Sequence, residues 1–348
     1  MDIRSHLLAG QAIPAHPLAL DSRRRFSERH QRALTRYYLE SGVGGLAVAV
    51  HSTQFEIREP KHGLLRPVLE LAAETARETV PLTGHEVALI AGVCGRTIQA
   101  VSEAALARDL GYHAALVSMA ALASEKESFI LNHLKTVAET MPIIGFYLQP
   151  TVGGRVFTVA FWRAVAEIPN LVAIKIAPFN RYQTVDVVRA TVEVGREDLA
   201  LYTGNDDALV TDLLTPFQFE RDHATVTRRI VGGLLGHWGV WTRAAAALFE
   251  QIKVVRNQPV LDAAWLTRAA AVTDMNAAVF DPAHQFAGCI PGILEVLRRQ
   301  GLVHSRCCLD PRESLSPGQA QELTRVSAAY PELTDDIFVA QNLDRWLR

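Results

Sequence analysis

The chain has 348 residues, of which 49% are hydrophobic and 21% charged, which suits a globular protein with a sizeable core. Its formal net charge is -2 and charges of both signs are spread along the chain, which argues against a strongly basic surface for nucleic acids or membranes. The four cysteines form no spaced CxxC pairs, a pattern that favours reduced thiols. There is no N-terminal signal pattern and no apolar stretch of about 20 residues, so we expect a cytoplasmic protein that binds neither nucleic acid nor membranes.

Short apolar runs alternate with longer amphipathic stretches from the N-terminus onward. After a weak first strand over residues 12–20, we expect strands at 45–50, 86–93, 114–119, 143–148, 171–177, 199–204 and 229–235. These runs are almost continuously apolar, which is typical of parallel strands that are covered on both faces.

Helices are predicted between the strands, and two of them have clear features. The helix over 97–110 ends before Gly111 and has its apolar stripe at Ile98, Val101, Ala105 and Leu110. The helix over 124–140 begins with a capping-box pattern at Ser124 and Glu127, and its stripe follows at Ile130, Leu134, Val137 and Met141.

This order of elements predicts an α/β fold, a (β/α)8 TIM barrel, because repeated strand–helix units over about 250 residues are its pattern. We expect a barrel domain with the catalytic site over residues 10–245, and C-terminal helices over 246–348 that pack on it. A doubly wound open sheet is the competing fold, but it usually has a glycine-rich turn after its first strand. The glycines of residues 42–45 precede a strand instead.

One lysine interrupts the most regular of these strands. Lys175 lies near the end of "LVAIKIA", residues 171–177, where an ammonium group is costly unless it is paired or loses its proton. An inward side chain would have a lowered pKa, and the neutral amine would attack a ketone to form a Schiff base. In the outward orientation, the aliphatic stem would pack along a helix and the ammonium group would be solvated by water. The spacing alone leaves both orientations open.

Polar residues at two other strand ends favour the inward orientation. Tyr147 ends the fifth strand, where a phenol beside the amine would relay protons during imine formation. His51, Ser52 and Thr53 directly follow the second strand, and such a hydroxyl-rich end is suited to hold a small carboxylate.

Together these segments resemble the dihydrodipicolinate synthase / N-acetylneuraminate lyase family of Schiff-base aldolases. The segments "HSTQFE", "YLQP" and "IKIAPFN" correspond to the family's "GTTGE" carboxylate loop, its "YNxP" tyrosine and its "IKxxS" lysine. The segments "AGVCGRT", "YTGNDD" and "GGLLGHWGVW" are similar to its third, seventh and eighth strand ends. The resemblance runs in consistent order over residues 10–305.

The resemblance implies a fold, a reaction and a set of site residues. Lys175 would form an imine with a 2-oxo acid such as pyruvate, and Tyr147 would move protons. A C–C bond, usually to an aldehyde, would then form or break without a metal or organic cofactor. The loop of His51, Ser52 and Thr53 would bind the carboxylate. Further substrate contacts would come from Asn205, Asp206, Gly232 and Gly233. Relatives with this fold commonly form dimers or tetramers, so the resemblance also implies a homo-oligomer.

Several departures from the family pattern make lysine-pathway synthesis doubtful. The arginine expected after "YNVP" is replaced by Val152, with Arg155 three residues further on. The tyrosine expected after the fourth strand is absent, with Ala120 and Ala121 in its place, and the first threonine of the carboxylate loop is His51. His51 would instead serve a different second substrate, as an acid–base group or a hydrogen-bonding group, or would be structural.

Two alternatives to an aldolase stay open at this point. The same imine would also support elimination by a dehydratase or deaminase acting on a sugar-acid-like 2-oxo acid. The missing arginine and tyrosine also allow a barrel that binds ligands without turnover.

Overall fold

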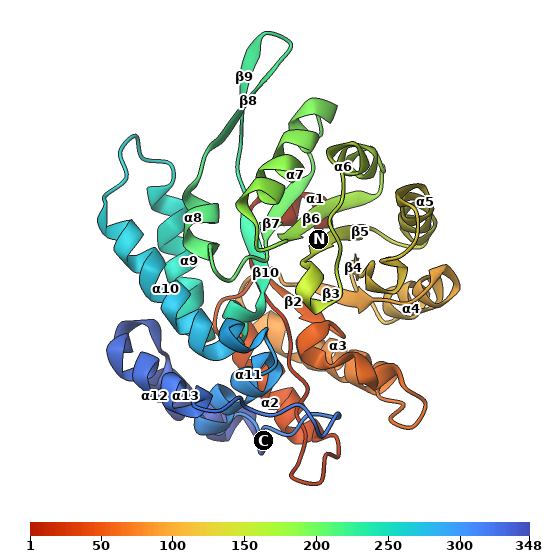
Figure 1. The fold of residues 1–348 in the computed structure, drawn as a ribbon. Helices are drawn as coiled ribbons and strands as arrows, with labels where there is room; N and C mark the ends of the chain where they lie inside the picture. The colour runs from red at the N-terminus through yellow and green to blue at the C-terminus, as the bar shows by residue number, and fades with distance from the viewer. The chain divides into compact units, whose positions relative to one another are not determined.

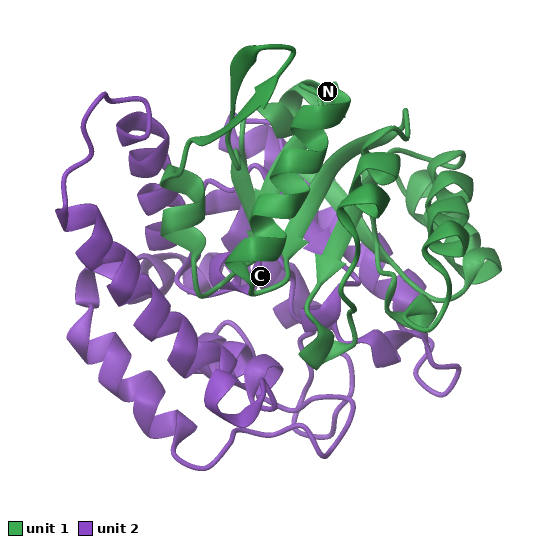
Figure 2. Cartoon of the chain, turned by 45° about the horizontal axis from the view of Figure 1, so that its top comes forward, with its two compact units in different colours: residues 1–11, 88–234 green, residues 12–87, 235–348 purple.

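The computed structural model describes all residues, 1–348, and Figure 1 shows the order of its elements. The chain forms two compact units, coloured separately in Figure 2. The first comprises residues 1–11 and 88–234, and the second residues 12–87 and 235–348. These bounds differ from the predicted division at residue 245, and the catalytic domain over 10–245 stays a prediction.

The first unit is built around a parallel sheet. Neighbouring strands pair in the order β10-β7-β6-β5-β4-β3. Their bounds are β3 (Ala88–Val93), β4 (Ala114–Val117), β5 (Ile143–Leu148), β6 (Leu171–Ala177), β7 (Ala200–Thr203) and β10 (Gly232–Leu235). All residues of β3, β4 and β7 are buried, which explains why these strands are apolar on both faces.

Helices follow the strands of this unit, and a hairpin is inserted before its last strand. The helices are α1 (Ile3–Leu8), α4 (Thr97–Asp109), α5 (Glu127–Ala138), α6 (Val159–Ala166), α7 (Arg181–Val194) and α8 (Leu209–Leu214). The hairpin strands β8 (Phe217–Arg221) and β9 (Ala224–Arg228) pair antiparallel, and the ribbon projects at the top of Figure 1. Neither the hairpin nor α1 was predicted from the sequence.

The second unit contains the first two strands and the C-terminal helices. Strands β1 (Ala12–Pro14) and β2 (Gly45–Val48) run parallel and are joined by a bridge between Ala15 and Ala47. The helices are α2 (Glu28–Glu40), α3 (Leu65–Thr83), α9 (Thr242–Val255), α10 (Ala264–Phe280), α11 (Cys289–Arg299), α12 (Gln319–Ala329) and α13 (Asp336–Trp346). Counted along the chain, eight parallel strands alternate with helices, as the predicted (β/α)8 fold requires.

A buried carboxylate fixes the start of the last helix within this unit. Asp335 accepts hydrogen bonds from the Tyr37 hydroxyl at 2.7 Å, the Arg243 amide at 2.9 Å and the Gln300 side chain at 2.8 Å. Burial raises the pKa of Asp335, and these donors oppose the shift. The C-terminal helices of this unit are therefore joined by specific polar contacts as well as by apolar packing.

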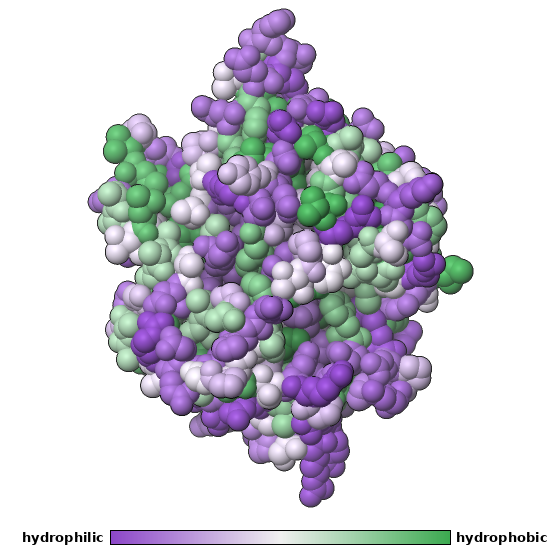
Figure 3. All heavy atoms as spheres, in the orientation of Figure 1, coloured by the Kyte–Doolittle hydropathy of each residue, from purple (hydrophilic) through white to green (hydrophobic).

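On the face shown in Figure 3, a group of exposed apolar side chains lies near the connection between α9 and α10. Its members are Val254, Val260, Leu261 and Leu266. No helix has both the length and the apolarity that a membrane crossing demands.

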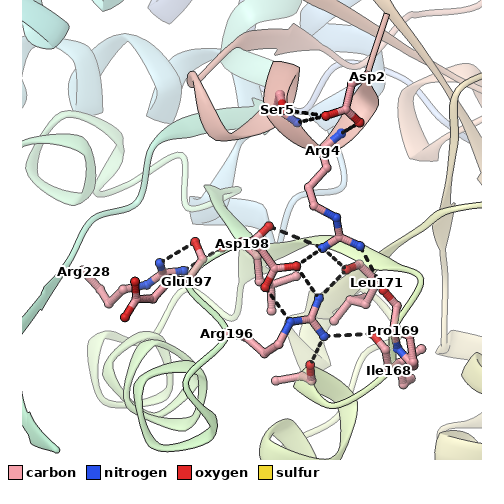
Figure 4. A network of polar contacts seen from close by, with 12 residues as sticks. Asp2, Arg4, Ser5, Ile168, Pro169, Leu171, Arg196, Glu197, Asp198 and Arg228 are labelled. Atoms are coloured by element: carbon pink, nitrogen blue, oxygen red, sulfur yellow. Dashed lines mark hydrogen bonds and ion pairs between the residues drawn. The ribbon is translucent and has the colours of Figure 1, made fainter.

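Two arginines hold the starts of β6 and β7 in the first unit (Figure 4). Arg196 donates to the carbonyls of Ala166, Ile168 and Leu171 at 2.6, 3.1 and 3.2 Å, and it pairs with Asp198 at 2.7 Å. Arg4 of α1 pairs with the same Asp198 and also donates to the Leu171 carbonyl. The strand that carries Lys175 is thus anchored at its other end.

We expect the substitution Arg196→Ala to lower the free energy of unfolding by about 2–3 kcal/mol, because it leaves carbonyl groups of partly buried backbone without a donor. Arg196→Lys should recover only part of this loss, because an ammonium lacks the planar fork that serves several carbonyls. Arg108→Ala is the matched control, since Arg108 is 53% exposed and contacts only neighbouring Asp109. Its effect should stay below about 1 kcal/mol. Urea unfolding curves measure all three, and equal losses in Arg196→Ala and Arg108→Ala would contradict this role.

Candidate active site

The orientation of Lys175 follows from its neighbours on β5 and β6. A Cβ atom built on Gly145 would lie 3.7 Å from Ile174 and 3.9 Å from Trp162 of α6, so Gly145 and Ile174 face the helices. Successive residues of a strand point to opposite faces. Lys175 therefore points away from the helices, toward the face that forms the interior in a (β/α)8 barrel. The predicted inward orientation is the one the structure has.

The Lys175 amine lies among apolar groups and bare backbone. Its Nζ is 4.3 Å from the centre of the Phe146 ring, which belongs to the paired residue on β5. On the other side, a Cβ atom built on Gly204 would lie 2.7 Å from Lys175 Cε, so the lysine stem runs against the backbone of that glycine. Desolvation lowers the pKa of Lys175 to about 8, although the nearby Asp206 carboxylate opposes the shift. The neutral form of the amine is therefore populated near physiological pH, although the ammonium form still predominates.

Tyr147 does not lie beside Lys175, which corrects the prediction from its spacing. In the register of β5 and β6, Phe146 pairs with Lys175 and Tyr147 pairs with Ile176. The Tyr147 ring packs on Trp162 of α6, with centroids 5.0 Å apart, and its hydroxyl accepts a hydrogen bond from the Phe157 amide at 3.3 Å. Burial raises the pKa of Tyr147. The phenol is on the helix-facing side of the sheet, opposite to the amine.

Asn205 has a scaffold role that the sequence did not indicate. Its side-chain oxygen accepts from the Phe179 amide at 3.0 Å, and its nitrogen donates to Asp212 at 2.9 Å and to Thr184 at 3.2 Å. These bonds connect the loop after β6 to the loop after β7. Because they occupy the Asn205 amide, the expected contact of this residue with substrate is not supported.

Asp212 is the centre of that network and was missed in the sequence. It is fully buried and accepts from the Thr203 hydroxyl at 2.8 Å, while its other oxygen pairs with Arg181. Burial raises the pKa of Asp212, and its hydrogen bonds oppose the shift. The network fixes the turn that contains Gly204 and Asp206. A single Asp inside an apolar helix of residues 209–214 was the only available signal.

Asp206 is the predicted residue of this loop that acts on the lysine. It is half-buried, follows Gly204 by two residues, and its carboxylate attracts the Lys175 ammonium. The next residue, Asp207, is exposed.

The paired glycines of β10 are close to other parts of the first unit. A Cβ atom on Gly232 would lie 2.5 Å from the Gln11 carbonyl oxygen and 2.7 Å from the Tyr202 ring. Gly233 donates its amide to the Gln11 carbonyl at 3.1 Å. Gly232 is thus required for contact with the N-terminal segment, which differs from the expected approach to a ligand.

The loop after β2 lies in the second unit and forms a short 3-10 helix, η1 (His51–Thr53). The Thr53 hydroxyl donates to the His16 carbonyl at 2.6 Å and accepts from the Val50 amide at 3.2 Å, so it is occupied within the loop. Ser52 differs, because its Oγ is buried and has no hydrogen-bond partner. His51 is exposed, with its ring 6.0 Å from that of Phe55.

Non-glycine residues in the left-handed conformation stand on both sides of η1. Ala49 has φ 61° and Gln54 has φ 69°, a conformation that is costly for residues with a side chain and is concentrated at functional loops. With the orphaned Ser52 hydroxyl, this makes the loop a candidate anion site within the second unit.

Arg155 is occupied by backbone groups of the first unit. Its guanidinium donates to the carbonyls of Ala123 and Glu125 at 3.1 and 2.7 Å and lies over the Phe157 ring at 5.2 Å. It therefore stabilises the loops after β4 and β5. The structure gives no support for Arg155 as a replacement for the arginine missing at Val152.

Comparisons with known proteins agree with this architecture. The model of the Dihydrodipicolinate synthetase family matches residues 10–217. A dihydrodipicolinate synthase from Agrobacterium tumefaciens is 18% identical with a TM-score of 0.73, over 93% of this chain and 99% of that one. A search of curated proteins by sequence finds no match.

Two further solved structures are similar along nearly their whole length. CdNal from Clostridium difficile, in complex with mannosamine, is 15% identical with a TM-score of 0.72, covering 92% of this chain and 99% of that chain. N-acetylneuraminate lyase from Fusobacterium nucleatum, complexed with pyruvate, is 17% identical with a TM-score of 0.71, covering 94% and 98%. These similarities confirm the (β/α)8 barrel, and the family match over more than half of the sequence shows that the chain belongs to the dihydrodipicolinate synthetase family.

Proposed function

We propose that this protein is a lyase of the Schiff-base aldolase type, in which Lys175 forms an imine with the C2 carbonyl of pyruvate or a related 2-oxo acid. One observation carries the proposal: the lysine points to the inner face of the sheet, where desolvation lowers its pKa to about 8. A surface lysine is almost entirely protonated at neutral pH and is a poor nucleophile. The family supplies the class of reaction, and the geometry supplies the nucleophile.

The site residues have distinct parts in this proposal. Lys175 supplies the nucleophile and, once it is an iminium ion, withdraws electrons from C3 so that a C–C bond there can break or form. Phe146 and the Gly204 backbone keep the amine desolvated and oriented. Within the second unit, the Ser52 hydroxyl, buried without a partner, is proposed as a donor to a small carboxylate.

The departures at Val152, Ala120 and Ala121 support a second substrate other than that of lysine biosynthesis. An aldehyde without a carboxylate at that end needs no arginine at position 152. A cytoplasmic location is proposed from the sequence pattern, in which the four cysteines form no spaced CxxC pairs. A homo-oligomer, dimer or tetramer, is proposed from the family alone.

Borohydride reduction in the presence of pyruvate tests the proposal. The full-length protein should gain the mass of one reduced pyruvate adduct, and peptide mapping should place it on Lys175. Reduction without pyruvate is the control. Absence of an adduct with pyruvate and with longer 2-oxo acids would overturn the proposed function.

A further inference from the structure

An imine-forming lysine needs a partner that moves protons, because the carbonyl oxygen must leave as water and the substrate C3 must lose a proton. The phenol of Tyr147 is the partner that the sequence pattern favours. In this chain its ring lies against α6 on the other face of the sheet, and its hydroxyl is bound to the Phe157 amide. The proton-transfer group of the first unit must therefore be sought among the residues that share a face with Lys175.

The paired neighbours of Lys175 on the adjacent strands do not supply such a group. Phe146 on β5 has no exchangeable proton. Tyr202 on β7 is paired with Lys175, but its hydroxyl donates to the Leu7 carbonyl at 2.8 Å and accepts from the Gln11 amide at 3.1 Å. Both hydrogen bonds hold the phenol against the N-terminal segment.

The loop after β7 supplies a group of the right chemistry. Its first residue, Gly204, is in contact with the stem of Lys175, and the Asn205 amide is occupied by Phe179, Thr184 and Asp212. Asp206 comes next, in a turn held by that same network, and its half-buried carboxylate attracts the Lys175 ammonium. A carboxylate that interacts with the reacting amine can both accept and return its proton.

From this arrangement we propose that Asp206 is the proton-transfer residue of the Lys175 Schiff base and that Tyr147 is structural, an inference that rests on the proposed function. The neutral amine attacks C2, and the carbonyl electron pair moves to the oxygen. The Asp206 carboxylate takes a proton from the positively charged nitrogen and gives it to that oxygen, which becomes a hydroxyl group. The nitrogen lone pair then closes the iminium bond as the hydroxyl group takes a proton from solvent water and leaves as water. The two protons of the amine and the one from solvent end as two on the departing water and one on the iminium nitrogen, and Asp206 is again a carboxylate.

The resulting Asp206 carboxylate then acts as the base for the next step. It takes one proton from C3, the C–H electron pair becomes the C2–C3 double bond, and the iminium bond electrons return to nitrogen. The product is a neutral enamine beside a protonated Asp206, which can give the proton back to C3. Repeated in D2O, this cycle replaces the methyl hydrogens of pyruvate by deuterium without any second substrate.

The exchange of the pyruvate methyl hydrogens for deuterium can be measured directly and tests the role of Asp206. Wild type, Asp206→Asn, Tyr147→Phe and Asp207→Asn are each incubated with pyruvate in D2O, and the loss of the methyl signal is followed by NMR. Borohydride trapping after long incubation reports in parallel whether the imine still forms. We expect Asp206→Asn to reduce exchange by about 10²- to 10⁴-fold while it still traps pyruvate. Tyr147→Phe and the matched control Asp207→Asn should stay within about threefold of wild type.

The possible outcomes separate the two proposals. If wild type traps pyruvate, but Asp206→Asn exchanges like wild type or Tyr147→Phe loses exchange as severely, the role of Asp206 is overturned and the Schiff-base function stands. If wild type traps no 2-oxo acid, the proposed function falls and the role of Asp206 falls with it. Slow exchange together with intact trapping in Asp206→Asn alone supports the inference, since a misfolded barrel would lose both signals.

Discussion

The substitution Lys175→Met is expected to abolish turnover of 2-oxo acids, by more than about 10⁴-fold, because it removes a covalent nucleophile. Methionine has a similar length and no charge, so it can occupy the space beside Phe146 and Gly204 without the cost of desolvating an ammonium. We therefore expect the melting temperature of the Lys175→Met variant to be equal to or higher than that of the wild type. Turnover assays, borohydride labelling and melting curves measure these effects together.

A matched lysine distinguishes the loss of the nucleophile from a general effect of methionine. Lys135 lies exposed on α5, so Lys135→Met should keep full activity and labelling. Retention of pyruvate turnover in Lys175→Met would show that another group carries the reaction.

The pH dependence of the wild type follows from the same amine. Attack requires the neutral form, and desolvation lowers the pKa of Lys175 to about 8. At pH 7.5 about a quarter of such an amine is neutral, compared with about 0.1% of an ordinary lysine. The rate of imine formation should therefore rise with pH through about 8 and level off above it. A rise that continues past pH 10 would indicate an unperturbed lysine.

The strands could be predicted from the sequence because each has a continuous apolar run. The predicted bounds of β5 and β6, 143–148 and 171–177, coincide with those of the structure. The hairpin of β8 and β9 was not predicted, because its alternating exposed residues are polar and resemble a loop. A continuous apolar run indicates a strand that is buried on both faces. This hairpin is largely exposed, so its strands have no such run.

The helices were located more accurately than their buried faces. In α4 the predicted stripe includes Ile98, which is 90% exposed, whereas Ala100, Ala104 and Ala107 are fully buried. Small alanine side chains allow the helix to pack closely against the sheet. Because alanine is less hydrophobic than isoleucine, an apolar stripe chosen by hydrophobicity favours Ile98 over these alanines. The predicted capping box of α5 was also wrong, since the N-cap residue is Lys126 and no side chain caps the helix. The buried stripe of α5 was correct.

The site shows why residue spacing alone did not fix side-chain orientation. Ile143 pairs with Leu171, but an irregularity between Ile143 and Ile144 shifts the register so that Phe146 pairs with Lys175. A shift of one residue moves a side chain to the opposite face of a strand. A family pattern that matches Tyr147 and Lys175 by their separation cannot detect such a shift. Lys175 itself was found because a charge in an apolar strand is a strong signal.

Gly204 is the second position where we expect a large effect, and the sequence pattern gave it no individual role. A Cβ atom there would lie 2.7 Å from Lys175 Cε and 2.7 Å from Ala177 Cβ, which is closer than nonbonded carbon atoms can approach. In Gly204→Ala, either the lysine stem or the backbone directly after β7 must move. A displacement of about 1 Å at a reacting group costs about 10²-fold in rate, so kcat/KM should fall by that order. Overpacking should also lower stability by about 1–3 kcal/mol.

A second glycine in the neighbouring strand provides the matched control. Gly145 faces α6, and a Cβ atom there would meet its nearest neighbour, Leu171, at 3.5 Å, an ordinary contact. Gly145→Ala should therefore keep activity within about twofold, because it adds a methyl group without displacing a catalytic atom. Steady-state kinetics and rates of pyruvate trapping, measured at a temperature where both variants are folded, compare the two positions. If Gly204→Ala traps pyruvate as fast as Gly145→Ala, the reactivity of the Lys175 amine does not depend on its contact with Gly204, and the proposed positioning of the amine by this backbone is wrong.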